Sequence, residues 1–331
     1  MTRLPWQHPT RRDSQTTKSR KRPYSQGFSP ICYTSNMQID LPEPTDTLST
    51  FLDAYHATAA RDQKGKHRLK WTISYWKTKY GDIPVTDITR RSLSQHIETR
   101  RIAGKSNSTI NREISILSAS INYAIRRWAW NISNPASGLY LKIPEGRLRW
   151  LTQAEAKNLL QHAKQSKAPH LVDFIQLALN TGMRRTEILK LEIRNIDQQN
   201  KKIHLDGTQT KNGKRRVIPL NDHALKAIQS RIASNTQNGK TGTRLFLQSN
   251  GRPVVQINTA FTNAVREAGI EDFRIHDLRH TFASWLVQSG VTLPEVRDLL
   301  GHATVKQTER YAHLAPGLLH KAVAILDTLD F

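Results

Sequence analysis

The chain has 331 residues, which is enough for two domains of about 100–200 residues each. Its 50 Lys and Arg residues outnumber 27 Asp and Glu residues, giving a formal net charge of +23 at pH 7. This surplus favours a polyanionic partner such as nucleic acid, with a merely basic surface as the alternative. The single cysteine, Cys32, excludes an internal disulfide framework and is typical of a reducing cytoplasm. The sequence contains neither an apolar run of membrane-spanning length nor a signal-peptide pattern.

Residues 1–45 are rich in Pro, Ser, Thr and basic residues and show little periodicity. We interpret them as a flexible basic leader. Two readings of the leader stay open, an arm that grips DNA and a plain disordered segment.

Residues 46–141 carry helical patterns and predict a compact helical domain. Apolar side chains recur on one face of its second helix, and the basic residues between them lie off that face. The apolar set is Leu69, Ile73, Trp76 and Tyr80, and the basic set is Arg68, Lys70, Lys77 and Lys79. Thr89 and Ser108 are predicted to cap the next two helices, and Asn134-Pro135 to stop the last one.

A basic linker at 142–150 leads to a second domain at 151–331. Thr152 and Glu155 have the spacing of a capping box at its first helix. The patterns further along predict helices near 152–165, 170–180, 185–192, 221–233, 258–268, 277–289, 294–300 and 304–312. Short strands at 203–205 and 216–220 flank Asn212-Gly213, a strong signal for a hairpin turn. The fold class is therefore mainly α with a small β-sheet.

Five short stretches of the second domain carry candidate functional residues. Each alone has an ordinary reading: a solvated arginine, a polar turn, a capped helix, a loop or a packing tyrosine. The stretches run from Thr181 to Leu189 (with Gly182 and Arg184), from Thr210 to Lys214 (with Lys211), from His276 to His280, from Leu300 to His302, and from Thr308 to His313 (with Tyr311). His276 and His280 stand four residues apart, as zinc ligands do. The sequence offers no third ligand and no HExxH glutamate, so we expect no metal.

In this order the stretches resemble the tyrosine recombinase (phage integrase) family. The family pattern is an arginine in a TGxR turn, a hairpin lysine, HxxR, GH and a tyrosine. Its counterparts here are Arg184, Lys211, His276, Arg279, His302 and Tyr311. The helical domain likewise looks like the family's core-binding (SAM-like) domain, including the run from Ser108 to Arg112. The resemblance implies a core-binding domain followed by an α+β catalytic domain.

The resemblance also implies a chemistry. Tyr311 would attack a DNA phosphate to give a 3′-phosphotyrosyl intermediate, while Arg184, Arg279 and His302 bind that phosphate. His276 would act as general base and Lys211 as general acid, without a metal, ATP or any other cofactor. Glu187 and His280 would orient these groups without contacting the phosphate themselves. Arg185 could share the work of Arg184.

The implied partners are double-stranded DNA at attachment sites, three further copies of the chain in a tetramer, and accessory DNA-bending or directionality proteins. Arg68, Lys70, Lys77, Lys79 and Arg112 are the predicted DNA-binding residues, and the cytoplasm is the predicted location. The apolar tail after Pro316 is expected to dock on a neighbouring protomer or, alternatively, on its own domain. The leader looks too poor in strand and core signals to be an arm-binding domain.

Three other functions remain open from sequence: a type IB topoisomerase, a resolvase of chromosome or plasmid dimers, and a DNA-binding protein without activity. An integrase of a prophage or mobile element is the favoured interpretation.

Overall fold

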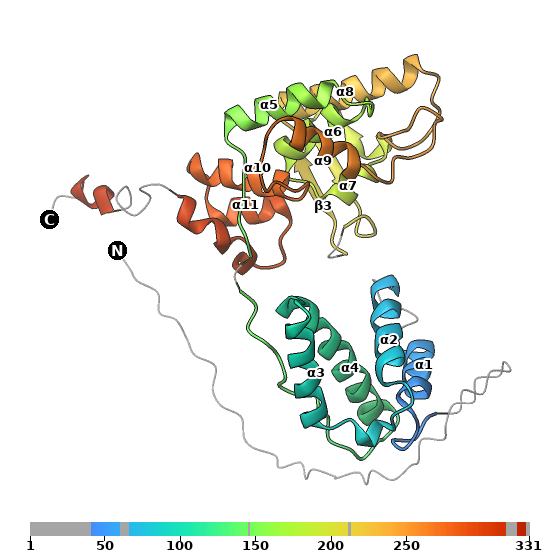
Figure 1. The fold of residues 1–331 in the computed structure, drawn as a ribbon. Coiled ribbons are helices and arrows are strands. Elements are labelled where there is room, and N and C mark those ends of the chain that lie inside the picture. The colour runs from blue at the N-terminus through green and yellow to red at the C-terminus, as the bar shows by residue number, and fades with distance from the viewer. Residues whose placement is uncertain (1–40, 60–65, 145, 211–212, 316–322, 329–331) are drawn as a thin grey trace, which may run out of the picture. The chain divides into compact units, whose positions relative to one another are not determined.

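The computed structural model describes residues 41–59, 66–144, 146–210, 213–315 and 323–328 (Figure 1). The chain divides into two compact units, one up to Pro144 and the other from Glu145 onward, and each is described here by itself. Most of the predicted leader, with Cys32, lies outside the described residues.

The first unit is a helical bundle, and its helices begin at polar caps. Its elements are α1 (Leu48–Thr58), α2 (Lys66–Tyr80), the 3-10 turn η1 (Val85–Asp87), α3 (Arg90–Ile102) and α4 (Asn107–Arg127). The side chain of Thr89 accepts from the backbone N–H of Ser92, which confirms the predicted cap of α3.

Two predictions about α4 are wrong. The helix is capped by Ser106, whose hydroxyl accepts from the backbone N–H of Thr109, and Ser108 lies inside the first turn. The helix also stops at Trp128, well before Asn134-Pro135, because Ala129 takes a left-handed conformation with φ 57°. That turn lets Trp128 and Trp130 pack against Phe51. Packing of the indole rings therefore decides where the helix ends.

A buried polar network links α2, α3 and α4 inside this unit. The carboxylate of Glu113 accepts from Arg100 at 2.6 and 3.0 Å and lies 3.3 Å from Nε2 of His96. Nδ1 of His96 is in turn 3.0 Å from the hydroxyl of Tyr80. The predicted apolar face of α2 packs above this network, with Trp76 only 1% exposed. A charge this deep is tolerated because both oxygens of the carboxylate accept from the charged Arg100.

The second unit surrounds a larger apolar core. Its helices are α5 (Gln153–Lys164), α6 (Leu171–Thr181), α7 (Arg185–Leu189), α8 (Asp222–Gln237), α9 (Asn258–Glu267), α10 (Asp277–Gln288) and α11 (Leu293–Leu300). Short 3-10 turns follow at η2 (Ile193–Asn195), η3 (Val305–Gln307), η4 (Glu309–Leu314) and η5 (Ile325–Thr328). The predicted capping box of Thr152 and Glu155 is confirmed at the start of α5.

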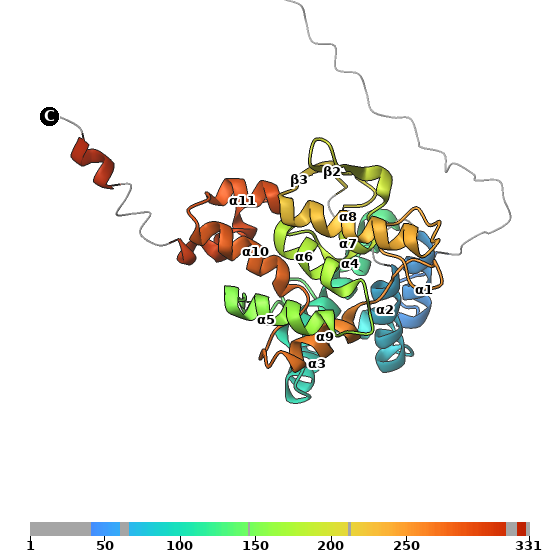
Figure 2. The ribbon, with the colours of Figure 1, turned by 90° about the horizontal axis from the view of Figure 1, so that it is seen from above.

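Helix α6 is the central element of this unit. It packs against α5, α8 and α10, and Figure 2 shows it between α8 and α10. Seven of its eleven residues are buried, and six of these seven are apolar, as expected for a helix packed on several sides. Its C-terminus is thereby held at the point where the predicted TGxR turn begins.

A three-stranded antiparallel sheet lies beside the helices, in the order β1 (Ile196–Asp197), β2 (Lys202–Leu205) and β3 (Arg216–Pro219). The predicted pairing of the second and third strands is confirmed, with Leu205 opposite Arg216. Strand pairing ends at Leu205 and Arg216, so the connection between the two strands is longer than two residues; Asn212 of the predicted turn lies outside the described residues. The strand β1 was not predicted, since two residues carry no alternation. None of the helices that the structure describes is long and apolar enough to cross a membrane.

We predict that Glu113→Ala destabilises the first unit strongly. The change leaves the buried His96 and the nearly buried Arg100 without their carboxylate partner, and breaking such a pair costs about 3–5 kcal/mol. Urea unfolding would measure the loss. Glu98→Ala is the matched control, because its pair with Arg101 is exposed and worth less than about 1 kcal/mol. Equal losses for the two variants would contradict a structural role for the network.

Candidate active site

The turn after α6 places the first candidate arginine. Gly182 ends the helix in the left-handed conformation with φ 60°, and Arg184 follows as the residue before α7. A Cβ on Gly182 would come within 2.4 Å of the Phe282 ring and 2.9 Å of Leu300. Only glycine fits, both for its φ and for this close approach. Gly182 therefore fixes the backbone position from which the side chain of Arg184 extends.

Glu187 is the buried anion that organises the site. Its side chain is 1% exposed, and its carboxylate accepts from Arg184 Nη1 at 2.7 Å and from Arg216 Nη2 at 2.8 Å. The backbone N–H of Arg184 donates to the same carboxylate at 3.0 Å. Arg216 comes from β3 and also donates to the backbone carbonyls of Leu299 and Leu300. One carboxylate thus joins α7 to β3 and orients two arginines.

A third arginine, Arg279 on α10, lies near Arg184 and Arg216. It is 4% exposed, and its guanidinium donates to the carbonyls of Gly182 at 2.6 Å and Leu300 at 2.7 Å. Burial lowers its pKa, and the positive charges of Arg184 and Arg216 lower it further. Such proximity of three cations to one carboxylate leaves an excess of positive charge, which a bound anion would neutralise.

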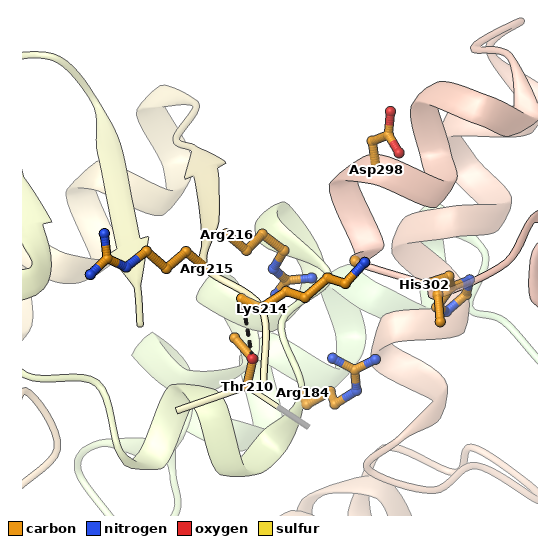
Figure 3. A pocket seen from close by; sticks show the side chains of 9 residues that line it. Arg184, Thr210, Lys214, Arg215, Arg216, Asp298 and His302 are labelled. Carbon is orange, nitrogen blue, oxygen red and sulfur yellow. Dashed lines mark hydrogen bonds between the residues drawn. The ribbon is translucent and has the colours of Figure 1, made fainter. Parts of the chain in front are cut away.

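A pocket of about 230 Å³ opens beside this cluster (Figure 3). Its lining is mostly basic: Arg184, Thr210, Lys214, Arg215, Arg216, Asp298, Gly301, His302 and Ala303. In Figure 3 the side chains of Lys214, Arg184 and His302 converge on one space from three different segments. Donors that converge on a hollow suit a phosphate group.

His302 faces this pocket with one ring nitrogen fixed by the protein. Its Nδ1 is 2.9 Å from the hydroxyl of Thr308, which is fully buried. Burial lowers the pKa of His302 to about 4, and Arg279 and Arg184 add to the shift. His302 is therefore neutral at pH 7, and in the tautomer in which Nδ1 accepts from Thr308, its Nε2 carries a proton that can be donated.

Tyr311 lies on η4, next to α10. Its side chain is 1% exposed and packs with Ala283, Val287, Val296 and Leu300. Its hydroxyl is 2.6 Å from Nδ1 of His280. Burial raises the pKa of Tyr311 to about 12, against a lowering effect of Arg279. The phenol is therefore neutral in this conformation.

His276 stands at the start of α10 and contacts His280 edge to face, at 5.1 Å between ring centres. The predicted grouping of His276, Arg279 and His280 is confirmed. Asp277 is the first residue of α10 and accepts from the backbone N–H of Arg274 at 2.8 Å. Asp277 also pairs with Arg147 of the predicted linker.

Some predicted residues lie elsewhere or outside the described residues. Lys211 and the side chain of Arg68 lie outside the described residues. Arg185 donates to Asn258 at 2.6 Å and is absent from the pocket lining. In the first unit, Lys70, Lys79 and Arg112 are exposed, whereas Lys77 pairs with Asp53 at 2.6 Å.

Sequence reasoning assigned no role to three pocket residues, Lys214, Arg215 and Arg216, although Lys214 ends the predicted hairpin stretch. The signal was present as a basic run after Asn212-Gly213, but it resembled a solvated turn. Among the residues that the structure describes, no group of three or more His, Cys, Asp or Glu is placed to hold a metal ion.

Sequence comparison assigns the chain to a family. Residues 149–317 match the phage integrase family, and residues 45–141 match the phage integrase N-terminal domain. The chain belongs to the phage integrase family. The resemblance carried by the six motif residues is thereby confirmed.

Among phage integrases, the chain is 34% identical to the integrase of Salmonella phage P22 over 226 residues and 29% identical to that of Escherichia phage 186 over 240 residues. These matches cover 65% and 71% of this chain, but only 56% and 65% of the two relatives. In fold, the chain resembles the Tn1549 transposon integrase in complex with a circular intermediate DNA, with a TM-score of 0.71 and 21% identity over 86% of this chain and 100% of the other. A lambda integrase dimer bound to a core site gives a TM-score of 0.67 and 22% identity over 80% and 95%.

We predict that Gly182→Ala destabilises the second unit and displaces Arg184. A left-handed alanine costs about 1–2 kcal/mol, and the contacts with Phe282 and Leu300 add about 1–3 kcal/mol. Gly239→Ala is the matched control, because Gly239 has the same φ of 60° and open space around its Cβ position. Thermal unfolding would compare the variants. If both lost the same stability, the close approach at Gly182 would have no consequence.

Proposed function

We propose that this chain is a site-specific DNA recombinase, an integrase of a prophage or other mobile element. The observation that carries the proposal is the pocket in which Arg184, Arg216, Lys214 and His302 converge, with a tyrosine on the adjoining η4 segment. Cationic forks around a phosphate-sized space, close to a hydroxyl nucleophile, suit the cleavage of a phosphodiester.

The proposed reaction has two balanced steps. The oxygen of Tyr311 attacks phosphorus, and the bond between phosphorus and the 5′-oxygen breaks. The phenol proton passes to a base, for which His276 is the candidate, and a proton from Lys211 reaches the leaving 5′-oxygen. A free 5′-hydroxyl of the partner duplex then reverses the sequence. The phosphotyrosyl bond retains the energy of the original bond, so no ATP is required.

The pocket side chains and the buried Arg279 divide this work. Arg184 and His302 line the pocket and are the candidates for direct contact with the phosphate oxygens. Arg279 has two donors committed to backbone carbonyls, so it would act through its charge and by holding Gly182 and Leu300 in place. Glu187 would keep Arg184 aimed at the pocket. Removing one such donor costs about 10²–10³ in rate in enzymes of comparable design.

We place DNA binding on both units. Lys70, Lys79 and Arg112 are exposed cations of the helical unit, and each phosphate contact would add to the salt dependence of binding. Lys77 would contribute less, because Asp53 already neutralises it. The partners would be double-stranded DNA at attachment sites and three further copies of the chain, with accessory DNA-bending or directionality proteins. The cytoplasm, where such DNA lies, is the proposed location.

A type IB topoisomerase and a dimer resolvase are less well supported. The match of residues 45–141 to the integrase N-terminal domain favours an integrase over both. Relaxation of a supercoiled plasmid that lacks any attachment site would instead support a topoisomerase.

We predict that the wild-type protein forms a covalent complex with attachment-site DNA nicked beside the cleavage position. Tyr311→Phe should bind the same DNA but form no complex, since it lacks the attacking oxygen. Denaturing gels would measure the complex, and EDTA would be present to test for metal dependence. Tyr140→Phe is the control for loss of an exposed phenol. A gel shift without any covalent band in the wild type would leave a DNA-binding protein and refute the catalytic proposal.

We also predict that deletion of residues 322–331 impairs assembly. The described part of this tail exposes Val323, Ile325 and Leu326, each more than half exposed, which suits docking on a neighbouring protomer. DNA binding by a single protomer should stay within about two-fold of the wild type, while the sedimentation coefficient of the DNA complex falls. Unchanged sedimentation would indicate that the tail packs on its own domain.

A further inference from the structure

The end of the predicted linker is bound to the second unit over several residues. The carbonyl of Gly146 accepts from Arg310 of η4 at 3.3 Å, and the backbone N–H of Leu151 donates to the hydroxyl of Thr281 on α10 at 3.1 Å. Between these two points the segment contacts the loop that leads into α10. A segment predicted as a linker is therefore part of the folded second unit.

Arg147 binds both ends of that loop. Its Nη1 donates to the backbone carbonyl of Asp272 and lies 2.7 Å from the Asp272 carboxylate, and its Nη2 lies 2.5 Å from the carboxylate of Asp277. Asp272 has a left-handed backbone with φ 46°, a conformation that residues other than glycine adopt at a cost in energy. A guanidinium that holds both ends therefore fixes a loop that the backbone alone would not favour.

The carboxylate of Asp277 has Arg147 as its only charged partner in the part of the chain that the structure describes. Its side chain is 7% exposed, and it also accepts from the backbone N–H of Arg274 at 2.8 Å. That N–H and the N-terminal end of α10 both favour the charged carboxylate. Loss of Arg147 would therefore leave a buried negative charge without a neutralising cation.

His276 lies inside the turn that Arg147 holds. The backbone N–H of Asp277 donates to the carbonyl of Arg274 at 2.8 Å, so His276 stands within this turn, directly before α10. Its ring contacts His280, whose pKa burial lowers to about 3, so this neighbour carries no charge at pH 7. The positive charge of Arg147 adds to that lowering of the His280 pKa, which shows that its field reaches this part of the site.

Cations from three segments surround His276 and keep its ring neutral. Burial has the largest effect and lowers the pKa of His276. Positive charges on α10, before α7 and on η4 lower it further: Arg279, Arg184 and Arg310. The carboxylate of Asp277 acts in the opposite direction and raises the pKa. Only a neutral imidazole can accept a proton, so the charge of this carboxylate has to be balanced.

We propose that Arg147 is a positioning residue for His276. It holds the loop that presents the imidazole and neutralises the carboxylate of Asp277 beside it, so that the ring stays in place and free of a second proton. The inference rests on the proposed function, because it takes His276 as the base that accepts the phenol proton. A basic residue of the predicted linker thus serves the reaction through its contacts within the second unit.

The pH dependence of cleavage tests this role. The rate of covalent complex formation on nicked DNA is measured from acidic to neutral pH, and it should fall as the pH drops through the pKa of His276. In Arg147→Ala the unneutralised Asp277 raises that pKa, so the acid limb should move up by about one pH unit. The plateau rate should fall about 10- to 100-fold, because the base is misplaced. Arg147→Lys keeps a charge beside Asp277 and should keep the acid limb of the wild type.

Removal of the carboxylate itself separates charge from position. Asp277→Asn should move the acid limb to lower pH, because the group that raises the pKa of His276 is gone. The double variant Arg147→Ala/Asp277→Asn leaves no buried charge unpaired, and its acid limb should coincide with that of Asp277→Asn. Its plateau rate should be lower still, because the hold on Asp272 is lost as well. Additive shifts of the limb, or equal plateau rates, would overturn the proposal.

Arg149→Ala is the matched control. Arg149 belongs to the same segment, but its carboxylate partner is Glu155 of α5. This variant should leave the acid limb where the wild type has it. If it moved the limb as far as Arg147→Ala does, a general loss of positive charge or of stability would account for the effect, and the proposal would fail.

NMR of the histidine rings tests the effect of Arg147 without any DNA cleavage. The full-length protein carries carbon-13 in its histidine rings, and the signal of His276 is the one that His276→Gln removes. Its titration midpoint should rise by about one pH unit in Arg147→Ala and fall in Asp277→Asn. An unchanged midpoint in folded Arg147→Ala protein would overturn the proposal. If the wild type formed no covalent complex, the proposed function would fail, while the titration would still measure the effect of Arg147 on His276.

Discussion

The burial of one carboxylate among three arginines is the constraint on which the second unit depends. Glu187 joins Arg184 before α7 to Arg216 on β3, and Arg279 on α10 stands behind them. Without the carboxylate, the guanidinium groups would repel one another in a largely buried site. With it, the cluster still carries surplus positive charge. The carboxylate thus offsets part of the repulsion, and the remaining positive charge would attract an anion.

Backbone carbonyls provide the second means of holding these cations. Leu300 accepts from both Arg216 and Arg279, and Gly182 accepts from Arg279. Both carbonyls belong to residues at helix C-termini, where carbonyl groups lack partners within the helix. The carbonyl groups at the C-terminal ends of α6 and α11 thus accept hydrogen bonds from Arg216 and Arg279. These bonds give partners both to the guanidinium groups and to carbonyls that the helices leave free. Packing of α6 between α8 and α10 fixes this arrangement in the core.

The sequence predicted the elements and motif residues better than their contacts. Capping at Thr89 and Thr152 and the grouping of His276 with His280 depend on neighbours a few positions apart, which helix spacing determines. The pairing of Glu187 with Arg216 and of His280 with Tyr311 joins residues about 30 positions apart, through the folded sheet and helices. No local pattern encodes such distances. The predicted end of α4 at Asn134-Pro135 was wrong for the same reason, because the packing of Trp128 against Phe51 involves residues far apart in the sequence.

The buried phenol of Tyr311 has a consequence for a protein of such high charge. With a net charge of +23, the chain would spend much of its time on DNA of arbitrary sequence, where affinity comes from counterion release alone. In the described conformation Tyr311 is buried and its pKa is raised to about 12, so contact with DNA would not by itself supply a phenolate for attack. The choice of cleavage site would then depend less on the affinity for that site than on whether binding there exposes Tyr311 from its apolar cluster. The rate of cleavage at unintended sites would then depend on the few side-chain contacts that bury Tyr311 in the 3-10 turn η4.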